Sequence, residues 1–218
     1  MKGLLVKDFR FLLKQKSSLL IFVGIGLYFL LTGVDVSFAL MFTVMMASIF
    51  ATSSISYDSF DNGMAFLMTL PIQKKTYVIS KYIFSLLVVV MMSGIIVLLA
   101  AIGANMGLEH LNLTDMKGML VVAAVFATVM ISLMTPIYII FGGENARMAI
   151  LAVYGIIAVI ALAVKALVGD VEAAAAKLFA NLASLKDWQL ACLGGGIMLA
   201  LVLVSMVISM VGLEKKEY

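Results

Sequence analysis

Six apolar stretches of roughly membrane-spanning length, none containing a charged residue or a histidine, dominate this sequence of 218 residues. A helix needs about 20 apolar residues to cross the hydrocarbon core of a bilayer. The stretches lie at about residues 19–34, 36–56, 82–108, 118–141, 148–164 and 190–213. Only 12% of the residues are charged and 64% are hydrophobic, whereas soluble domains are about 25% charged and about 45–50% apolar. We therefore predict an all-α polytopic membrane protein, with residues 1–218 forming a single domain of six transmembrane helices.

The distribution of charge predicts the turns and the orientation. Asp35 alone separates the first two stretches, and an acid at a bilayer centre costs about 2.5–3.5 kcal/mol, so we expect the chain to turn there. With the N-terminus inside the cell, eleven of the fifteen lysines and arginines lie on the cytoplasmic side. The positive-inside rule then predicts that both termini are cytoplasmic. We expect no cleaved signal peptide, since the first stretch exceeds a usual apolar region of about 7–15 residues.

Several classes of function are excluded or disfavoured by what the sequence lacks. Short loops leave no room for a soluble catalytic domain, and there is no P-loop pattern for ATP. The single Cys192 cannot form an internal disulfide, the single His110 predicts no metal site, and a net charge of +3 predicts no nucleic-acid partner. A carrier driven by protons or ions needs ionisable groups within the membrane, and the stretches contain none. If the protein transports a substrate uphill, a partner must supply the energy.

Two further segments predict helices that lie on the membrane. In residues 1–16 one face is apolar and the opposite face basic, which is typical of a helix at an anionic lipid surface; the alternative is a basic topology signal. The apolar face carries Leu5, Val6, Phe9, Leu12 and Leu13, and the basic face Lys7, Arg10 and Lys14. Residues 170–187 predict an external amphipathic helix, which either packs over the bundle as a lid or takes part in gating.

The connection between the second and third stretches, residues 57–81, predicts a short cytoplasmic helix over residues 58–70. Asp58 and Asp61 suit its start, where carboxylates meet free backbone N–H groups, and Pro71 ends it. Its apolar positions, at helical spacing, are Phe60, Met64, Leu67 and Met68. Such a helix is too short to cross the membrane. Its partner is a groove on a soluble protein or the bilayer surface.

These residues carry a resemblance to a known family. Asp58 and Asp61, Gly63, the run Leu-Met-Thr-Leu-Pro at residues 67–71, the lysines at 74 and 75, and Ser-Lys-Tyr at 80–82 resemble the cytoplasmic loop of type-2 permeases of ATP-binding-cassette (ABC) transporters. The first nine residues, MKGLLVKDF, are similar to the start of short bacterial members, such as the peptide and drug exporter permeases that include phenol-soluble-modulin exporters. Met64 departs from the pattern, since many members carry a small polar residue there.

The resemblance implies a division of labour between this chain and a partner. Residues 1–16 would be an elbow helix and residues 58–70 a coupling helix bound in a cleft of a separate ATPase subunit, present in two copies, which would bind the ATP and Mg. The loop at residues 142–147 would be a second contact; the alternative is a tight turn formed by its two glycines. The coupling residues so implied are Asp58, Phe60, Asp61, Met64, Leu67, Met68, Leu70, Glu144 and Arg147.

A stripe of polar residues and methionine on the second stretch suggests a path for a substrate. Met45, Ser48, Thr52 and Ser56 could line a translocation path for an amphipathic molecule, although ordinary helix packing is the favoured explanation. The predicted function is the non-catalytic permease subunit of an exporter in the bacterial cell membrane, paired with a second permease copy, and a homodimer is favoured over a heterodimer. Its cargo would be an amphipathic or antimicrobial peptide or a hydrophobic drug. The alternative is an unpowered channel or a secondary carrier.

Overall fold

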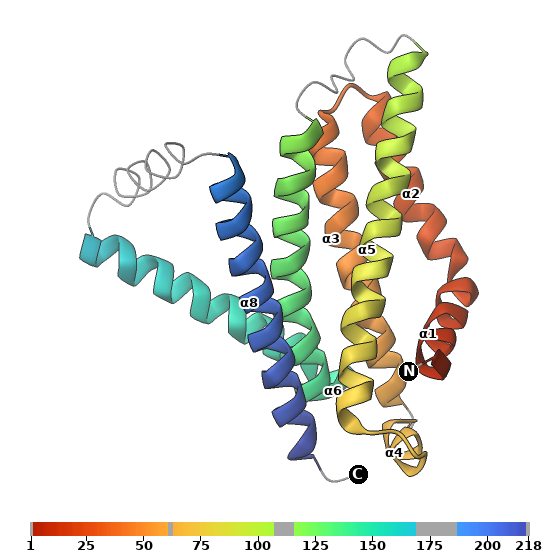
Figure 1. The fold of residues 1–218 in the computed structure, drawn as a ribbon, viewed down its shortest axis with the longest axis vertical. Helices are drawn as coiled ribbons and strands as arrows, with labels where there is room; N and C mark the ends of the chain where they lie inside the picture. Colours follow the sequence, from red (N-terminus) through yellow and green to blue (C-terminus); the bar gives the residue numbers. More distant parts are fainter. Residues whose placement is uncertain (1, 61–62, 107–115, 169–186, 217–218) are drawn as a thin grey trace.

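The computed structural model describes residues 2–60, 63–106, 116–168 and 187–216, and within these ranges the chain forms helices and short connections, without a strand. The prediction of an all-α protein is therefore confirmed for the described residues. Most of the long helices lie side by side in one bundle (Figure 1). The helices are α1 (Lys2–Lys14), α2 (Lys16–Leu31), α3 (Val36–Ser59), α4 (Gly63–Thr69), α5 (Lys74–Asn105), α6 (Met116–Val168) and α8 (Asp187–Glu214).

Four helices in the described ranges are long and apolar enough to cross a membrane. They are α3, α5, the Gly118–Gly143 part of α6 and the Cys192–Glu214 part of α8. A fifth crossing is obtained if α1 and α2, which bend by 67° where they meet, count as one broken span. The expected number of six spans is not confirmed. The first predicted span corresponds to α2, which has only 16 residues, and the predicted span at 148–164 lies in the second part of α6.

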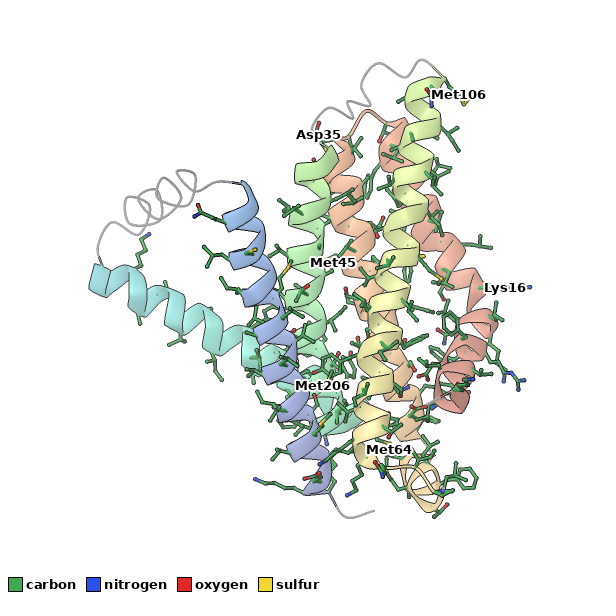
Figure 2. All side chains as sticks on the ribbon, viewed as in Figure 1. Lys16, Asp35, Met45, Met64, Met106 and Met206 are labelled. Atoms are coloured by element: carbon green, nitrogen blue, oxygen red, sulfur yellow. The ribbon has the colours of Figure 1, made fainter. Side chains whose placement is uncertain are left out.

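The chain turns between α2 and α3 where Asp35 predicts it. Helix α2 ends at Leu31, and the Thr32 backbone N–H donates to the Tyr28 carbonyl oxygen. Gly33 then takes a φ of 80°, a left-handed conformation that glycine adopts without steric cost. This turn lies at the end of the bundle opposite α4, as the labelled positions of Asp35 and Met64 in Figure 2 show.

Helix α6 breaks at Gly142, and the part that follows, residues 143–168 (the α6 arm), leaves the bundle (Figure 1). Gly142 has φ 76° and ψ 171°, which ends the regular hydrogen bonding of the first part. The freed Gly143 N–H donates to Ser59 Oγ at 3.0 Å, and the freed Ile139 carbonyl oxygen accepts from Lys216 Nζ at 3.2 Å. Gly142 thus interrupts the helix, and the backbone groups freed at the break are satisfied by side chains from α3 and the C-terminal segment.

The sequence predicts a kink at Pro136 in the fourth span; Pro136 lies inside the first part of α6, and the residue with non-helical backbone angles is Gly142. Proline has no N–H, so Pro136 leaves the Ser132 carbonyl oxygen without its usual donor four residues on. Ser205 Oγ of α8 donates to this oxygen at 2.6 Å. A neighbouring helix therefore supplies the missing hydrogen bond, as a bilayer requires.

Helix α3 lies at the centre of the packing, in contact with α2, α4, α5 and α6. Most of its buried side chains are small or β-branched, and Ala39, Val44 and Ala47 are completely buried. Small residues let helix backbones approach closely, which drives association in a lipid environment. On the α6 side, Gly143 lies so close to Ser56 that an added Cβ would be 2.9 Å from the serine Cβ.

Candidate functional site

The short helix predicted between the second and third stretches is present as α4, a helix of seven residues at one end of the bundle (Figure 1). It is shorter than the predicted range of residues 58–70. Asp58 belongs to the last turn of α3 and does not start the new helix, and Phe60 is extended, with ψ 143°. The other acid of the pair, Asp61, lies outside the described residues. At the far end α4 stops at Thr69, before Pro71, as predicted.

The side chains of this connection divide into an exposed and a buried group. Phe60 and Phe66 are 65% and 68% exposed, and Leu70 is also exposed. We call Phe60, Phe66 and Leu70 the exposed apolar face. Met64, in contrast, is buried, and two further predicted coupling residues, Leu67 and Met68, are half-buried and pack against the hydrophobic core of the bundle. Among the predicted coupling residues whose side chains the structure describes, Phe60 and Leu70 are thus the ones most accessible to a partner.

Gly63 permits α4 to lie close to the end of α3. A Cβ added to Gly63 would be 2.8 Å from the Asp58 carbonyl oxygen, too close for any other residue without a backbone shift. This contact gives a physical reason for a glycine between the acids and the apolar residues of the loop. It also places α4 directly against Asp58, whose carboxylate belongs to a cluster of charged side chains.

A group of six side chains, which we call the ion cluster, joins α1, α3 and α5 at the α4 end; five of them are buried, and the side chain of Lys7 is 36% exposed. Its members are Lys7, Asp8, Ser54, Asp58, Tyr77 and Lys81. Lys81 Nζ lies 2.7 Å from Asp8 Oδ1, 2.7 Å from Asp58 Oδ2 and 2.7 Å from Ser54 Oγ.

The rest of the ion cluster completes the charge balance. Lys7 forms an ion pair with Asp58 Oδ1 and lies 3.7 Å from Asp8 Oδ1. Tyr77 donates its hydroxyl hydrogen to Asp58 Oδ2 at 3.0 Å, and Ser54 donates to Asp8 Oδ1 at 2.9 Å. Two lysines thus face two aspartates. Such pairing is what makes buried charge tolerable, because an unpaired charge away from water is strongly destabilising.

Sequence reasoning placed Asp58 at a partner surface and gave Asp8 and Lys81 no role beyond the resemblance. In the structure all three carboxylate and ammonium groups are buried in the ion cluster. One signal was available for Asp8: it lies four residues after Leu4 and four before Leu12, and these three residues form the buried stripe of α1. Val6 and Leu13, which were predicted on the apolar face, are instead exposed. An acid on the buried stripe of an amphipathic helix calls for a cationic partner.

The segment after α8 is attached to the same end of the molecule. Lys74 Nζ, from the first turn of α5, donates to the carbonyl oxygens of Leu213, Glu214 and Lys216 at 2.9–3.3 Å. An ammonium group at a helix C-terminus is favourable because the last carbonyls carry partial negative charge. Lys216 reaches Ile139 beside the α6 break, and burial lowers the pKa of its ammonium group.

Tyr82, next to Lys81, connects α5 to α8. Its hydroxyl group lies 2.6 Å from Ser205 Oγ and 3.0 Å from Ser209 Oγ. Since Ser205 also donates to the Ser132 carbonyl oxygen, one polar chain joins α5, α8 and α6 inside the apolar bundle. All three residues of the Ser-Lys-Tyr motif therefore make defined contacts, because Ser80 donates to the Tyr77 carbonyl oxygen within α5.

The predicted path residues lie inside the helix packing. Ser48 and Thr52 are completely buried and donate to carbonyl oxygens of their own helix, at 2.8–3.1 Å. Met45 is half-buried, and Ser56 packs against Gly143. Away from this stripe, an apolar cavity of about 380 Å³ lies between α6 and α8, lined by residues that include Ser132, Pro136, Val153 and Leu201.

For the remaining predicted coupling residues, the structure shows where the backbone lies. Glu144 and Arg147 lie in the first turns of the α6 arm, directly after the break. The predicted external helix at residues 170–187 lies almost entirely outside the described residues. Within the described ranges no group of three His, Cys, Asp or Glu side chains is arranged to hold a metal ion.

The fold and the site together define a class: a helical membrane protein of several spans, with a short apolar helix exposed at one end of the bundle. The chain belongs to the ABC-2 family of transporter proteins, whose family model matches residues 3–214. The resemblance to type-2 ABC permeases is thereby confirmed, and membership implies a membrane transport subunit that works with an ABC ATPase. No curated protein and no solved structure matches the chain.

Proposed function

We propose that this protein is the membrane-spanning permease subunit of an ATP-driven exporter in the bacterial cell membrane. Two copies face each other around a central path, and each rests α4, its coupling helix, in the cleft of an ATPase subunit that binds ATP and Mg. ATP binding draws the two ATPase subunits together and moves the coupling helices, which switches the path from inward to outward access. The cargo is an amphipathic peptide or a hydrophobic drug.

One observation carries this proposal within the family: the exposed apolar face of the α4 connection. Phe60 and Phe66 are aromatic and about two-thirds exposed in the described part of the chain, while their neighbours Met64 and Leu67 pack α4 against the bundle. Exposed aromatic residues on a short, well-anchored helix are typical anchors for a hydrophobic groove on a partner.

The positions of α1 and the end of α8 support cytoplasmic termini. Both lie at the α4 end of the molecule, through the contacts of Lys7 with Asp58 and of Lys74 with the C-terminal turn of α8. If α4 meets a cytoplasmic ATPase, both ends of the described chain are on the cytoplasmic side as well. If α1 and α2 together form one crossing, the described helices make five, so termini on the same side require one more, which we assign to the α6 arm.

The test is a pair of charge substitutions, Phe60→Glu and Phe66→Glu, in the chain co-expressed with an ABC ATPase encoded next to it. We expect each variant to insert in the membrane and to lose at least tenfold of the ATPase that co-purifies with the native chain, because the anchors can no longer enter an apolar groove. Met106→Glu is the matched control, since Met106 is 80% exposed and lies at the opposite end of α5 (Figure 2).

Retention of the ATPase by both phenylalanine variants would refute the coupling assignment. Co-purification of no ATPase with the native chain, together with transport by the purified chain alone, would instead support the alternative of an unpowered channel or secondary carrier.

A further inference from the structure

Lys81 lies at the meeting point of three helices, two of which flank the coupling helix α4. We infer that Lys81 is a positioning residue that makes α1, the end of α3 and the start of α5 move with α4 as one unit; its role in transport rests on the proposed function. Lys81 and Asp8 are each only 1% exposed, so their contacts are internal to the molecule.

The buried carboxylate of Asp8 depends on Lys81 for a cationic partner. Asp8 Oδ2 is buried without a hydrogen-bond partner among the described residues, and its Oδ1 is contacted by Lys81 and Ser54 at 2.7 and 2.9 Å. Lys7 lies farther away, at 3.7 Å, and pairs more closely with Asp58. The charge of Asp8, which fixes the buried stripe of α1, is therefore compensated chiefly from α5.

The same ammonium group of Lys81 also joins the two helices on either side of α4, because it contacts Asp58 at the end of α3. Asp58 stands just before α4 and Lys81 follows it two turns into α5, and the two are in direct contact at 2.7 Å. Gly63 brings α4 against the Asp58 backbone. A displacement of α4 must therefore move Asp58, Lys81 and, through Lys81, Asp8 of α1.

The contacts of Lys81 with Asp8 and Asp58 are strong ones. Charge-assisted hydrogen bonds are shorter and stronger than neutral ones, and surrounding low-dielectric material strengthens them further. Tyr77 adds a hydroxyl donor to Asp58 and places its ring 5.3 Å from the Lys81 ammonium group. Lys81 thus has contacts on several sides, which restrict its side chain to one arrangement.

The experiment measures the distance between α1 and α4 in the full chain without any ATPase. Spin labels are attached at Leu13→Cys and Thr69→Cys, both exposed positions, in a Cys192→Ser background that removes the single native cysteine. The protein is reconstituted in nanodiscs of phosphatidylethanolamine and phosphatidylglycerol, and pulsed electron paramagnetic resonance gives the distance distribution. We expect a narrow distribution for native Lys81 and for Lys81→Arg.

Two variants test the link. Lys81→Met removes the bridge but leaves excess negative charge, so Lys81→Met/Asp8→Asn is measured beside it, because it leaves only the Lys7–Asp58 pair. We expect both to broaden the distribution at least twofold. Lys75→Met, on an exposed lysine of the same helix, is the matched control and should leave it unchanged.

A native-width distribution in the folded double variant would overturn the inference. A double variant that fails to fold would also overturn it, since Lys81 would then determine the fold and not the position of α1. Because no ATPase is present, either result is independent of the proposed function, which the phenylalanine substitutions in the coupling helix test separately.

Discussion

Helices α3 and α8 are both apolar membrane spans, yet they occupy opposite places in the molecule. In the membrane-spanning stretch of α3, 61% of the residues are buried, and in that of α8, 17%. Helix α3 nevertheless has the lower mean hydropathy, 1.8 against 2.6 for α8. In water the more hydrophobic helix would be inside. In a bilayer, lipid chains solvate leucine and valine as well as protein does, so the inner helix is the one with small residues and hydroxyl groups that pack closely.

The largest expected effect concerns the ion cluster at the end of α3. We expect Lys81→Met to lower the free energy of unfolding by about 3–5 kcal/mol, because it leaves buried carboxylates without their partner. Reversible unfolding in mixed detergent micelles gives the value. Lys75→Met should change it by less than about 0.5 kcal/mol, as is usual for surface positions. Equal effects of the two substitutions would show that the buried end of α3 does not depend on charge pairing.

The next test compares the same enlargement on the two helices. Ala47→Leu in α3 introduces three carbon atoms at a completely buried position, so we expect a loss of about 1–3 kcal/mol from overpacking. Ala200→Leu in α8 is the matched substitution at an exposed position, and lipid should accommodate it at little cost. Thermal unfolding of both variants in the same detergent measures the difference, and a larger effect in α8 would reverse the assignment of inner and outer spans.

The smallest expected effect concerns the polar contact by which α8 remains attached. Ser205→Ala removes the donor to the Ser132 carbonyl oxygen, and we expect it to cost about 0.5–1.5 kcal/mol. In a Pro136→Ala background the substituted residue regains a backbone N–H that can bond to the same carbonyl, so the cost of Ser205→Ala should shrink. A double-mutant cycle measures this coupling. A cost that is the same in both backgrounds would show that Ser205 does not compensate for the proline.

The sequence predicts the positions of the helices well but not their faces. Uncharged apolar runs mark α3, α5 and the first part of α6 to within a few residues at most ends, because the bilayer imposes a length on each span. Hydropathy does not distinguish lipid from protein, so the buried face of α3 and the exposed face of α8 could not be read from it. Charged residues near span ends were assigned to loops, yet Asp58 and Lys81 belong to helices α3 and α5.

The candidate site shows the same division between local and distant information. Pro71 and the run of apolar residues predict α4 from neighbouring positions. The burial of Asp58 depends on Lys7 and Lys81, which are 51 and 23 positions away in the chain, and no local pattern encodes those pairings. The exposed Phe66 was missed because helical spacing alone selected Leu67 and Met68 for the outer face, whereas contacts with the bundle decide which side faces inward.

The hydrogen bond from Lys216 to Ile139 has a consequence for the order in which the molecule is completed during synthesis. Ile139 emerges from the ribosome 77 residues before Lys216. The separation is larger for Lys74, which donates to the carbonyl oxygens of Leu213 and Lys216, 139 and 142 residues later in the chain. The start of α5 and the break in α6 therefore enter the membrane with bonding groups that await the end of α8. These hydrogen bonds can form only after α8 and the residues that follow it have been synthesised.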